Sequence, residues 1–222
     1  MYIFIITSCI NSVSSVMDTE TRFNDTFKTI ESIRLKVPNS FIILSESSPE
    51  KLAKNKLDLL RPKVDRLLIL SDIPLVQDLG NKFLKSSAET LNLSLAFDFI
   101  KSFKLPNVKR IFKLTGRGEL ADEFDISYYE NPELIGKYVF KKRITSWNDP
   151  QKSLVSTRCW SFCYSLFDET HEMLARVFNG CMYVGPDVEH VIFSELDLTK
   201  LVEKDMVHFK CQISRTGLVE YD

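Results

Sequence analysis

Short apolar segments and helically spaced apolar positions alternate along the first half of the chain. The apolar segments predict strands at residues 2–7, 41–44, 67–70 and 110–115. Between them, apolar residues three or four positions apart predict helices through residues 23–33, 49–60 and 86–104. Pro38 and Pro106 end the first and last of these helices. This order predicts an α/β fold with a mostly parallel sheet and helices on both faces.

The second half of the chain has shorter and more mixed patterns. We expect a strand over residues 137–143, helices over 168–178 and 187–196, and a closing strand over 207–213. No linker-like segment separates the two halves, and 222 residues is a common size for one domain. The expectation is therefore a single domain over residues 1–222.

Charge and cysteine content narrow the range of functions. The 29 Lys and Arg nearly balance the 30 Asp and Glu, so no overall positive field would attract nucleic acid. No apolar stretch is long enough to span a bilayer, and the N-terminus lacks the features of a signal peptide. Five scattered cysteines, an odd number, are typical of reduced thiols in a cytoplasmic protein.

Several common enzyme signatures are missing from the sequence. It has no G-x-G-x-x-G after the first strand, no G-x-x-x-x-G-K-S/T and no G-x-S-x-G, which argues against the usual dinucleotide, P-loop and hydrolase sites. Cys159 and Cys163 have no second pair of Cys or His at a spacing that suits zinc. We interpret both cysteines as core thiols.

The strand predicted at residues 110–115 leads into the turn Gly116-Arg117-Gly118-Glu119. In open α/β sheets ligands bind beyond the carboxyl ends of the strands, so this turn is well placed to meet a phosphate. Arg117 offers a permanently charged, bidentate donor, and its flanking glycines allow close approach of the backbone. Lys113 would assist if its side chain faced the same cleft; an ordinary strand-end charge is the simpler interpretation.

Several segments are similar to viral and bacterial glycosyltransferase-like proteins. One is Phe112-Lys113-Leu114-Thr115-Gly116-Arg117, followed by Leu120 and Phe124. The others are Ile6-Thr7-Ser8-Cys9-Ile10-Asn11, the spaced residues Arg22, Thr26, Thr29, Ile30, Ser32, Ile33 and Arg34, the tripeptide Pro38-Asn39-Ser40, and Leu44 with Glu46. Together they span about the first 125 residues.

The resemblance implies a GT-A-like fold, a three-layer sandwich built on a mostly parallel, Rossmann-like sheet. It implies that residues 1–125 hold a nucleoside-diphosphate sugar and that residues 126–222 shape the site for a glycan or other hydroxyl acceptor. The implied function is transfer of the sugar to that acceptor, and the implied source is a large virus or phage. The alternative is a non-catalytic nucleotide- or glycan-binding domain that lost the metal site.

Proteins of this type commonly hold Mn²⁺ or Mg²⁺ on an acidic D-x-D sequence at the end of the fourth strand. This chain has Thr115-Gly116-Arg117-Gly118-Glu119 there. We therefore expect Arg117 to bind the diphosphate in place of a metal, with Lys113, Thr115 and Gly116 beside it. Glu119 alone would be a weak site for Mn²⁺ or Mg²⁺, and no cofactor is assigned.

The resemblance places further polar residues at the nucleotide. Thr7, Ser8 and Asn11 follow the first strand, where base and ribose would bind; capping of the next turn also explains them. Arg22 either reaches the nucleotide or lies at the surface of the helix start. Glu46 either binds the base or ribose or is an exposed loop carboxylate.

Glu189 is the candidate general base, because an inverting transfer needs a carboxylate to deprotonate the acceptor hydroxyl. Stabilisation of a helix dipole is the alternative. Arg143 and Trp147 are candidates for the acceptor side, because a basic group suits phosphate and an aromatic ring suits a sugar face. A solvated strand edge is the alternative for Arg143, and a place in the core is the alternative for Trp147. Ser86 and Glu89 have the spacing of a capping box and are interpreted as helix caps.

Overall fold

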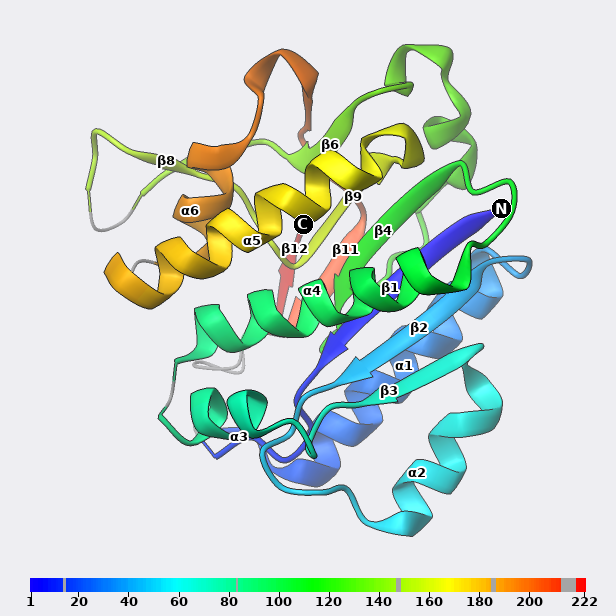
Figure 1. Cartoon of the computed structure of the whole chain (residues 1–222). Helices are drawn as coiled ribbons and strands as arrows, with labels where there is room; N and C mark the ends of the chain where they lie inside the picture. Colours follow the sequence, from blue (N-terminus) through cyan, green and yellow to red (C-terminus); the bar gives the residue numbers. More distant parts are fainter. Residues whose placement is uncertain (14, 83, 147–148, 185–186, 213–218) are drawn as a thin grey trace.

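The structure is a computed structural model that describes residues 1–13, 15–82, 84–146, 149–184, 187–212 and 219–222. At its centre lies a seven-stranded sheet in the order β10-β6-β9-β4-β1-β2-β3 (Figure 1). The strands are β1 Tyr2–Ser8, β2 Phe41–Glu46, β3 Arg66–Ile69, β4 Arg110–Thr115, β6 Tyr138–Lys141, β9 Cys159–Cys163 and β10 Leu201–Lys204. Only β9 runs antiparallel to its neighbours in this sheet, so the expected mostly parallel α/β fold is confirmed.

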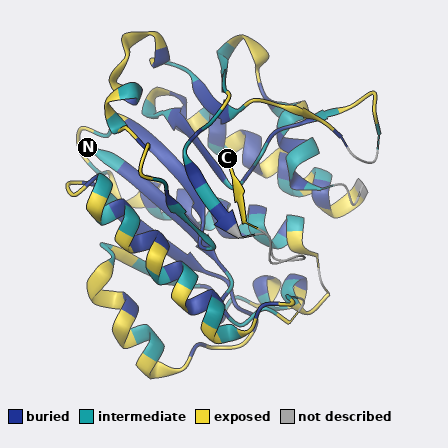
Figure 2. Cartoon of the chain, turned by 180° about the vertical axis from the view of Figure 1, so that it is seen from behind, coloured by how far each residue is buried: buried dark blue, intermediate teal, exposed yellow. Residues whose placement is uncertain are grey.

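Helices cover both faces of the sheet, as Figures 1 and 2 show. One face carries α4 (Lys85–Phe103), α5 (Phe167–Val184) and α6 (Val188–Glu195). The other carries α1 (Thr19–Lys36) and a small sheet of β5 (Gly118–Leu120), β11 (Phe209–Gln212) and β12 (Val219–Tyr221). The remaining elements are α2 (Lys54–Leu60), α3 (Pro74–Asn81), the β7 (Ile144–Thr145) and β8 (Ser153–Leu154) hairpin, and five short 3₁₀ turns.

The apolar character of β1 follows from its position between two cores. Ile3 and Ile5 pack on the face covered by α4, whereas Phe4 and Ile6 pack on the face covered by α1. All four side chains are fully buried. A strand that is covered on both faces is apolar at most positions, which is why β1 appears in the sequence as a continuous apolar run.

Some predicted elements differ from the observed ones. The helix predicted from residue 49 begins only at Lys54, because residues 47–53 form the loop that leaves β2. The short helix α3 was not predicted from the sequence. The predicted closing strand is present as β11, but it pairs with β5 and β12 rather than with the main sheet.

No disulfide joins the five cysteines, and Cys159, Cys181 and Cys211 are buried in the cores. The interpretation as a core thiol holds for Cys159, whereas Cys163 at the end of β9 is only partly buried. None of the described helices is both long and apolar enough to cross a membrane.

Gly118 is fixed by packing between β5 and β11. A Cβ atom at this position would collide with the carbonyl oxygen of Lys210 and lie 2.6 Å from the ring of Phe209. The sequence suggested that this glycine lets a phosphate approach. In the structure, a neighbouring strand occupies the space beside it.

We expect Gly118→Ala to destabilise the protein, because the added methyl group forces β11 away from β5. Overpacking of this kind costs about 1–3 kcal/mol, which lowers the melting temperature by roughly 2–10 °C in a chain of this size. Glu119→Ala is the matched control, since it removes only a half-exposed ion pair with Lys210. Equal melting temperatures for the two variants in thermal unfolding would contradict this account.

Candidate functional site

A cleft lies beyond the carboxyl ends of β1, β2 and β4. Its walls are the loops that follow these strands, the end of α3, and the first turns of α4. β1 and β4 are adjacent and parallel with Thr7 opposite Thr115, so both strands end at the same point. The described residues that line this cleft all fall between positions 7 and 117.

Two arginines face the cleft from different elements. Arg22, on α1, is 8% exposed and donates from Nε to the Cys9 carbonyl (2.6 Å) and from Nη1 to Ser15 Oγ (3.1 Å). Arg117 follows β4, and its Nε lies 3.4 Å from Thr115 Oγ1. Neither forms an ion pair with a described carboxylate. Burial and the charge of Arg117 lower the pKa of Arg22, as expected for two cations that share a cleft.

The ends of β1 and β4 are joined by a small polar network. The Gly116 amide donates to the Thr7 carbonyl (2.9 Å), and Thr26 Oγ1 donates to the Gly116 carbonyl (2.9 Å). Ser8 Oγ lies 3.2 Å from Thr26 Oγ1. Thr7, Ser8 and Thr115 line the cleft, and Gly116 lies beside them in a small adjoining pocket. The sequence analysis expects all four residues at the nucleotide.

Glu46 and Asn11 lie behind the cleft wall and do not line it. Glu46 is 1% exposed, and its Oε1 accepts from the amides of Ile10 (3.1 Å) and Ser48 (2.9 Å). The backbone amide of Asn11 donates to Ser48 Oγ (2.8 Å). Glu46 is therefore not an exposed loop carboxylate, and both residues join the loop after β1 to the loop after β2.

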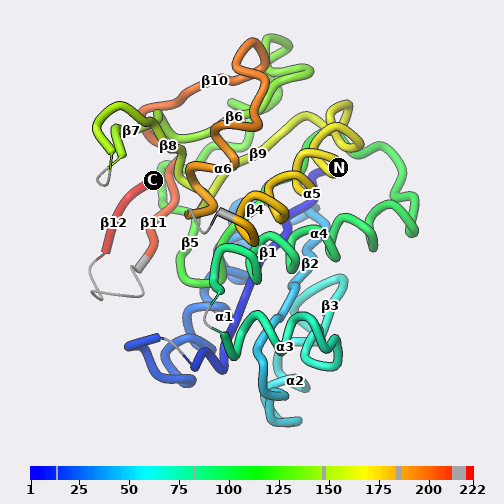
Figure 3. The backbone as a smooth tube through the Cα atoms, turned by 60° about the vertical axis from the view of Figure 1, so that its left-hand side comes forward, coloured from blue at the N-terminus to red at the C-terminus, as the bar shows by residue number. Residues whose placement is uncertain are grey.

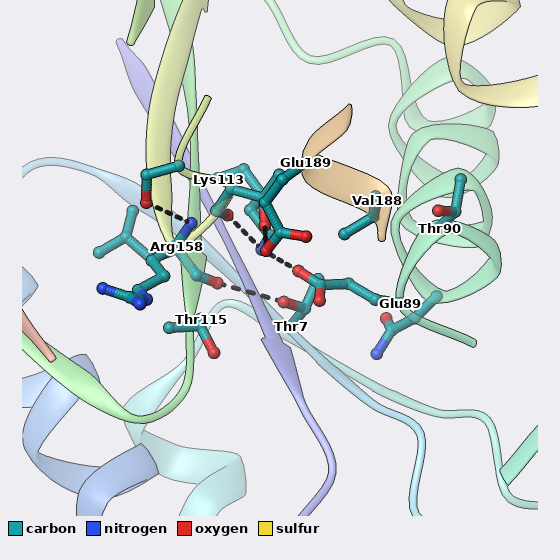
Figure 4. Close-up of polar contacts among 12 residues, drawn as sticks. Thr7, Glu89, Thr90, Lys113, Thr115, Arg158, Val188 and Glu189 are labelled. Atoms are coloured by element: carbon teal, nitrogen blue, oxygen red, sulfur yellow. Dashed lines mark hydrogen bonds and ion pairs between the residues drawn. The ribbon is translucent and has the colours of Figure 1, made fainter. Parts of the chain in front are cut away.

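Lys113 is buried on β4 rather than exposed at a strand end. Its ammonium forms an ion pair with Glu89 on α4 and donates to the Thr157 carbonyl (2.7 Å). Thr157 Oγ1 in turn donates to Oε1 of Glu189 on α6 (3.1 Å). Figure 4 shows Glu89 and Glu189 converging near this lysine. Glu89 lines the cleft, whereas Lys113 and Glu189 do not.

The predicted capping box at the start of α4 is wrong. The N-cap residue is Leu84, and no side chain caps the helix there. Ser86 Oγ instead accepts from the Val188 amide (3.2 Å) at the start of α6. Glu89 is drawn to Lys113, because a buried ammonium needs a charged partner more than an exposed helix end needs a cap.

The expected acceptor and metal residues are not gathered at the cleft. Arg143 is already paired with Glu203, through Nε to Oε1 (2.9 Å) and Nη2 to Oε2 (2.6 Å). Glu119 pairs with Lys210 at 3.3 Å. Trp147 lies outside the described residues. Within the described ranges, no three His, Cys, Asp or Glu residues cluster in a way that could hold a metal ion.

Asn92, on α4, is a cleft residue that the sequence analysis missed. It is 2% exposed and donates from Nδ2 to the Ser45 carbonyl (3.1 Å) and to Ser47 Oγ (2.9 Å). The carbonyl acceptor fixes the orientation of the amide, and Oδ1 has no partner among the described residues. Residues 85, 89 and 92 are polar positions on one face of this helix, a signal that was present in the sequence.

Neither a family model nor a curated protein matches the chain. Solved structures do resemble it. A glycosyltransferase involved in glycosylation of the major capsid of PBCV-1 has 10% identity and a TM-score of 0.52 over 92% of this chain and 82% of that one. Core-mannan synthase A from Aspergillus fumigatus, in an Mn/GDP form, has 9% identity and a TM-score of 0.49 over 90% and 71%. The fold is GT-A-like, as the sequence resemblance implied.

Glu189 provides a test of the electrostatics behind the cleft. Burial, and then the charge of Glu89, raise its pKa above the ordinary 4.5. The unfolded chain therefore loses this proton at lower pH than the folded chain, so stability is lost as pH rises through the raised pKa. We expect Glu189→Gln to raise the melting temperature by a few degrees at pH 8 and to leave it unchanged below about pH 4. Thr157 can still donate to the amide oxygen.

Glu172→Gln is the matched control for this measurement, because Glu172 is exposed on α5. Its effect on the melting temperature should be the same at both pH values. If Glu189→Gln raised the melting temperature more at pH 4 than at pH 8, the predicted pH dependence would be reversed and a raised pKa of Glu189 would be contradicted.

Proposed function

We propose that this chain is a glycosyltransferase that transfers a sugar from a nucleoside-diphosphate sugar to a glycan or other hydroxyl acceptor. The observation that carries the proposal is the pair Arg22 and Arg117, which face one cleft at the carboxyl ends of the strands without a carboxylate partner. Two guanidinium groups repel each other until an anion neutralises them, so the cleft favours a multiply charged ligand such as a diphosphate.

The hydroxyl groups around the arginines support the same ligand. Ser8, Thr7 and Thr115 lie at the ends of β1 and β4, and Ser47 follows β2. These groups can donate to phosphate or ribose oxygens, and Asn92, which lines the same cleft, orients the Ser47 hydroxyl by donating to its oxygen. The cleft therefore offers both the charge and the polarity that a nucleotide requires.

Arg117 takes the place of a metal ion in this proposal. The residues at the end of β4 fit Mn²⁺ or Mg²⁺ poorly, because the turn has no D-x-D sequence, Glu119 is paired with Lys210, and the described residues include no cluster of three metal-binding side chains. As the bond between sugar and diphosphate breaks, negative charge grows on the leaving phosphate oxygen. A fixed guanidinium stabilises that charge through two parallel hydrogen bonds.

The two halves of the chain have different roles in this proposal. Residues 1–125 bind the nucleotide, because the cleft residues that the structure describes all belong to this half. Residues 126–222 shape the acceptor side, because α6 lies beside the first turns of α4 (Figure 3) and the Val188 amide donates to Ser86 there. The Thr157 carbonyl also accepts from Lys113, the ion-pair partner of Glu89. Glu189, the base candidate from the sequence, lies behind Glu89 in this arrangement.

Thermal shift measurements test the proposal. We expect one nucleotide among UDP, GDP and CDP to raise the melting temperature of the wild type in EDTA. A ligand at a hundred times its dissociation constant contributes about 2.7 kcal/mol, or roughly 5–10 °C in a chain of this size. Arg117→Ala should lose most of this shift. Arg61→Ala is the matched control, because Arg61 is exposed, precedes β3 and does not line the cleft. This variant should keep the thermal shift.

Three outcomes would be informative. No shift of the wild type by any nucleotide at millimolar concentration would overturn the proposal. A shift that requires Mn²⁺ would overturn the role of Arg117 in place of a metal. Nucleotide binding without sugar transfer to any acceptor would favour the alternative of a non-catalytic nucleotide-binding domain.

A further inference from the structure

Among the described residues, Glu89 is the carboxylate that lines the cleft. Its side chain is 32% exposed and lines the cleft wall from the second turn of α4. Oε1 is held by the Lys113 ammonium. Oε2 forms no hydrogen bond to any described residue, so it is available to a ligand in the cleft.

Lys113 fixes the position of this carboxylate. Its side chain is 2% exposed, and the ammonium donates to Glu89 and to the Thr157 carbonyl. A buried lysine between two fixed acceptors has little freedom to move. Glu89 belongs to α4, but its carboxylate is held in position by Lys113 on β4.

Glu189 is placed behind Glu89 rather than in the cleft. It accepts a hydrogen bond from Thr157 and does not line the cleft. Burial and the nearby Glu89 raise its pKa, so this carboxyl favours the protonated form more than an ordinary glutamate does. Of the two carboxylates, only Glu89 combines access to the cleft with an unpartnered oxygen.

We propose that Glu89 is the general base of the transfer and that Lys113 is its positioning residue. This inference rests on the proposed function. The acceptor hydroxyl oxygen attacks the anomeric carbon of the donor and forms the new glycosidic bond. The bond from that carbon to the phosphate oxygen breaks, and its electron pair leaves with the nucleoside diphosphate. The hydroxyl proton passes to Oε2 of Glu89, which later releases it to water.

Release of nucleoside diphosphate tests the assignment. The donors are UDP-glucose, UDP-galactose, UDP-N-acetylglucosamine and GDP-mannose, with water and free monosaccharides as acceptors. A positioned base contributes about 10²–10⁴-fold to the rate. Glu89→Gln should therefore lower kcat at least hundredfold while the nucleotide-induced thermal shift is kept. Glu89→Asp, which keeps the charge at a shorter reach, should restore part of the rate.

Lys113→Met should lower kcat without changing the KM for the donor, because it displaces the base but leaves the arginines in place. A merely structural lysine would change the melting temperature and leave kcat of the folded fraction intact, which would overturn its role. Glu172→Gln is the matched control for loss of one carboxylate and should keep full turnover, since this residue is exposed on α5.

The outcomes separate the two proposals. If the wild type releases diphosphate and Glu89→Gln retains more than a third of that rate, the assignment of Glu89 fails and the proposed function stands. The assignment also fails if Glu89→Gln loses the thermal shift, because the residue then binds the donor. If the wild type releases no diphosphate from any donor, the proposed function fails and the assignment fails with it.

Discussion

The buried ammonium of Lys113 is the constraint on which the site depends. Lys113 lies in the middle of the sheet, where an unpaired charge would cost several kcal/mol. Its two acceptors come from opposite directions in the sequence, Glu89 from α4 and the Thr157 carbonyl from the segment before β9. Satisfying one charge therefore fixes where α4 begins relative to β4 and where the second half of the chain returns to the cleft.

Local sequence patterns predicted the frame of the molecule well. The strands β1 and β2 are mostly apolar because both faces are covered, and β4 with its following turn places Thr115 and Arg117 at the cleft. The errors arose where a side chain is committed to a distant partner. The spacing of Ser86 and Glu89 is that of a capping box. In the structure Ser86 contacts Val188 and Glu89 contacts Lys113, and these distant contacts are not visible in the local sequence.

The cleft is electrically divided. Arg22 and Arg117 make the end near α1 and β4 positive, whereas at the end near α6 the charge of Glu89 is balanced by the Lys113 ammonium. A sugar donor carries its diphosphate on one side of the anomeric carbon, so its binding is favoured in the orientation that places the diphosphate at the arginines. Under the proposed function, this polarity orients the donor before any base-specific contact is made. The nearly neutral composition of the whole chain conceals this local separation of charge.

The position of Glu46 also affects the thermodynamics of ligand binding. Its buried carboxylate holds the amides of Ile10 and Ser48 and so joins the two loops that form one wall of the cleft. A loop that is free in the empty protein must be ordered by its ligand, at a cost of about 1–2 kcal/mol for each residue fixed. Here that conformational entropy is lost during folding. More of the interaction energy at this wall is therefore available as affinity.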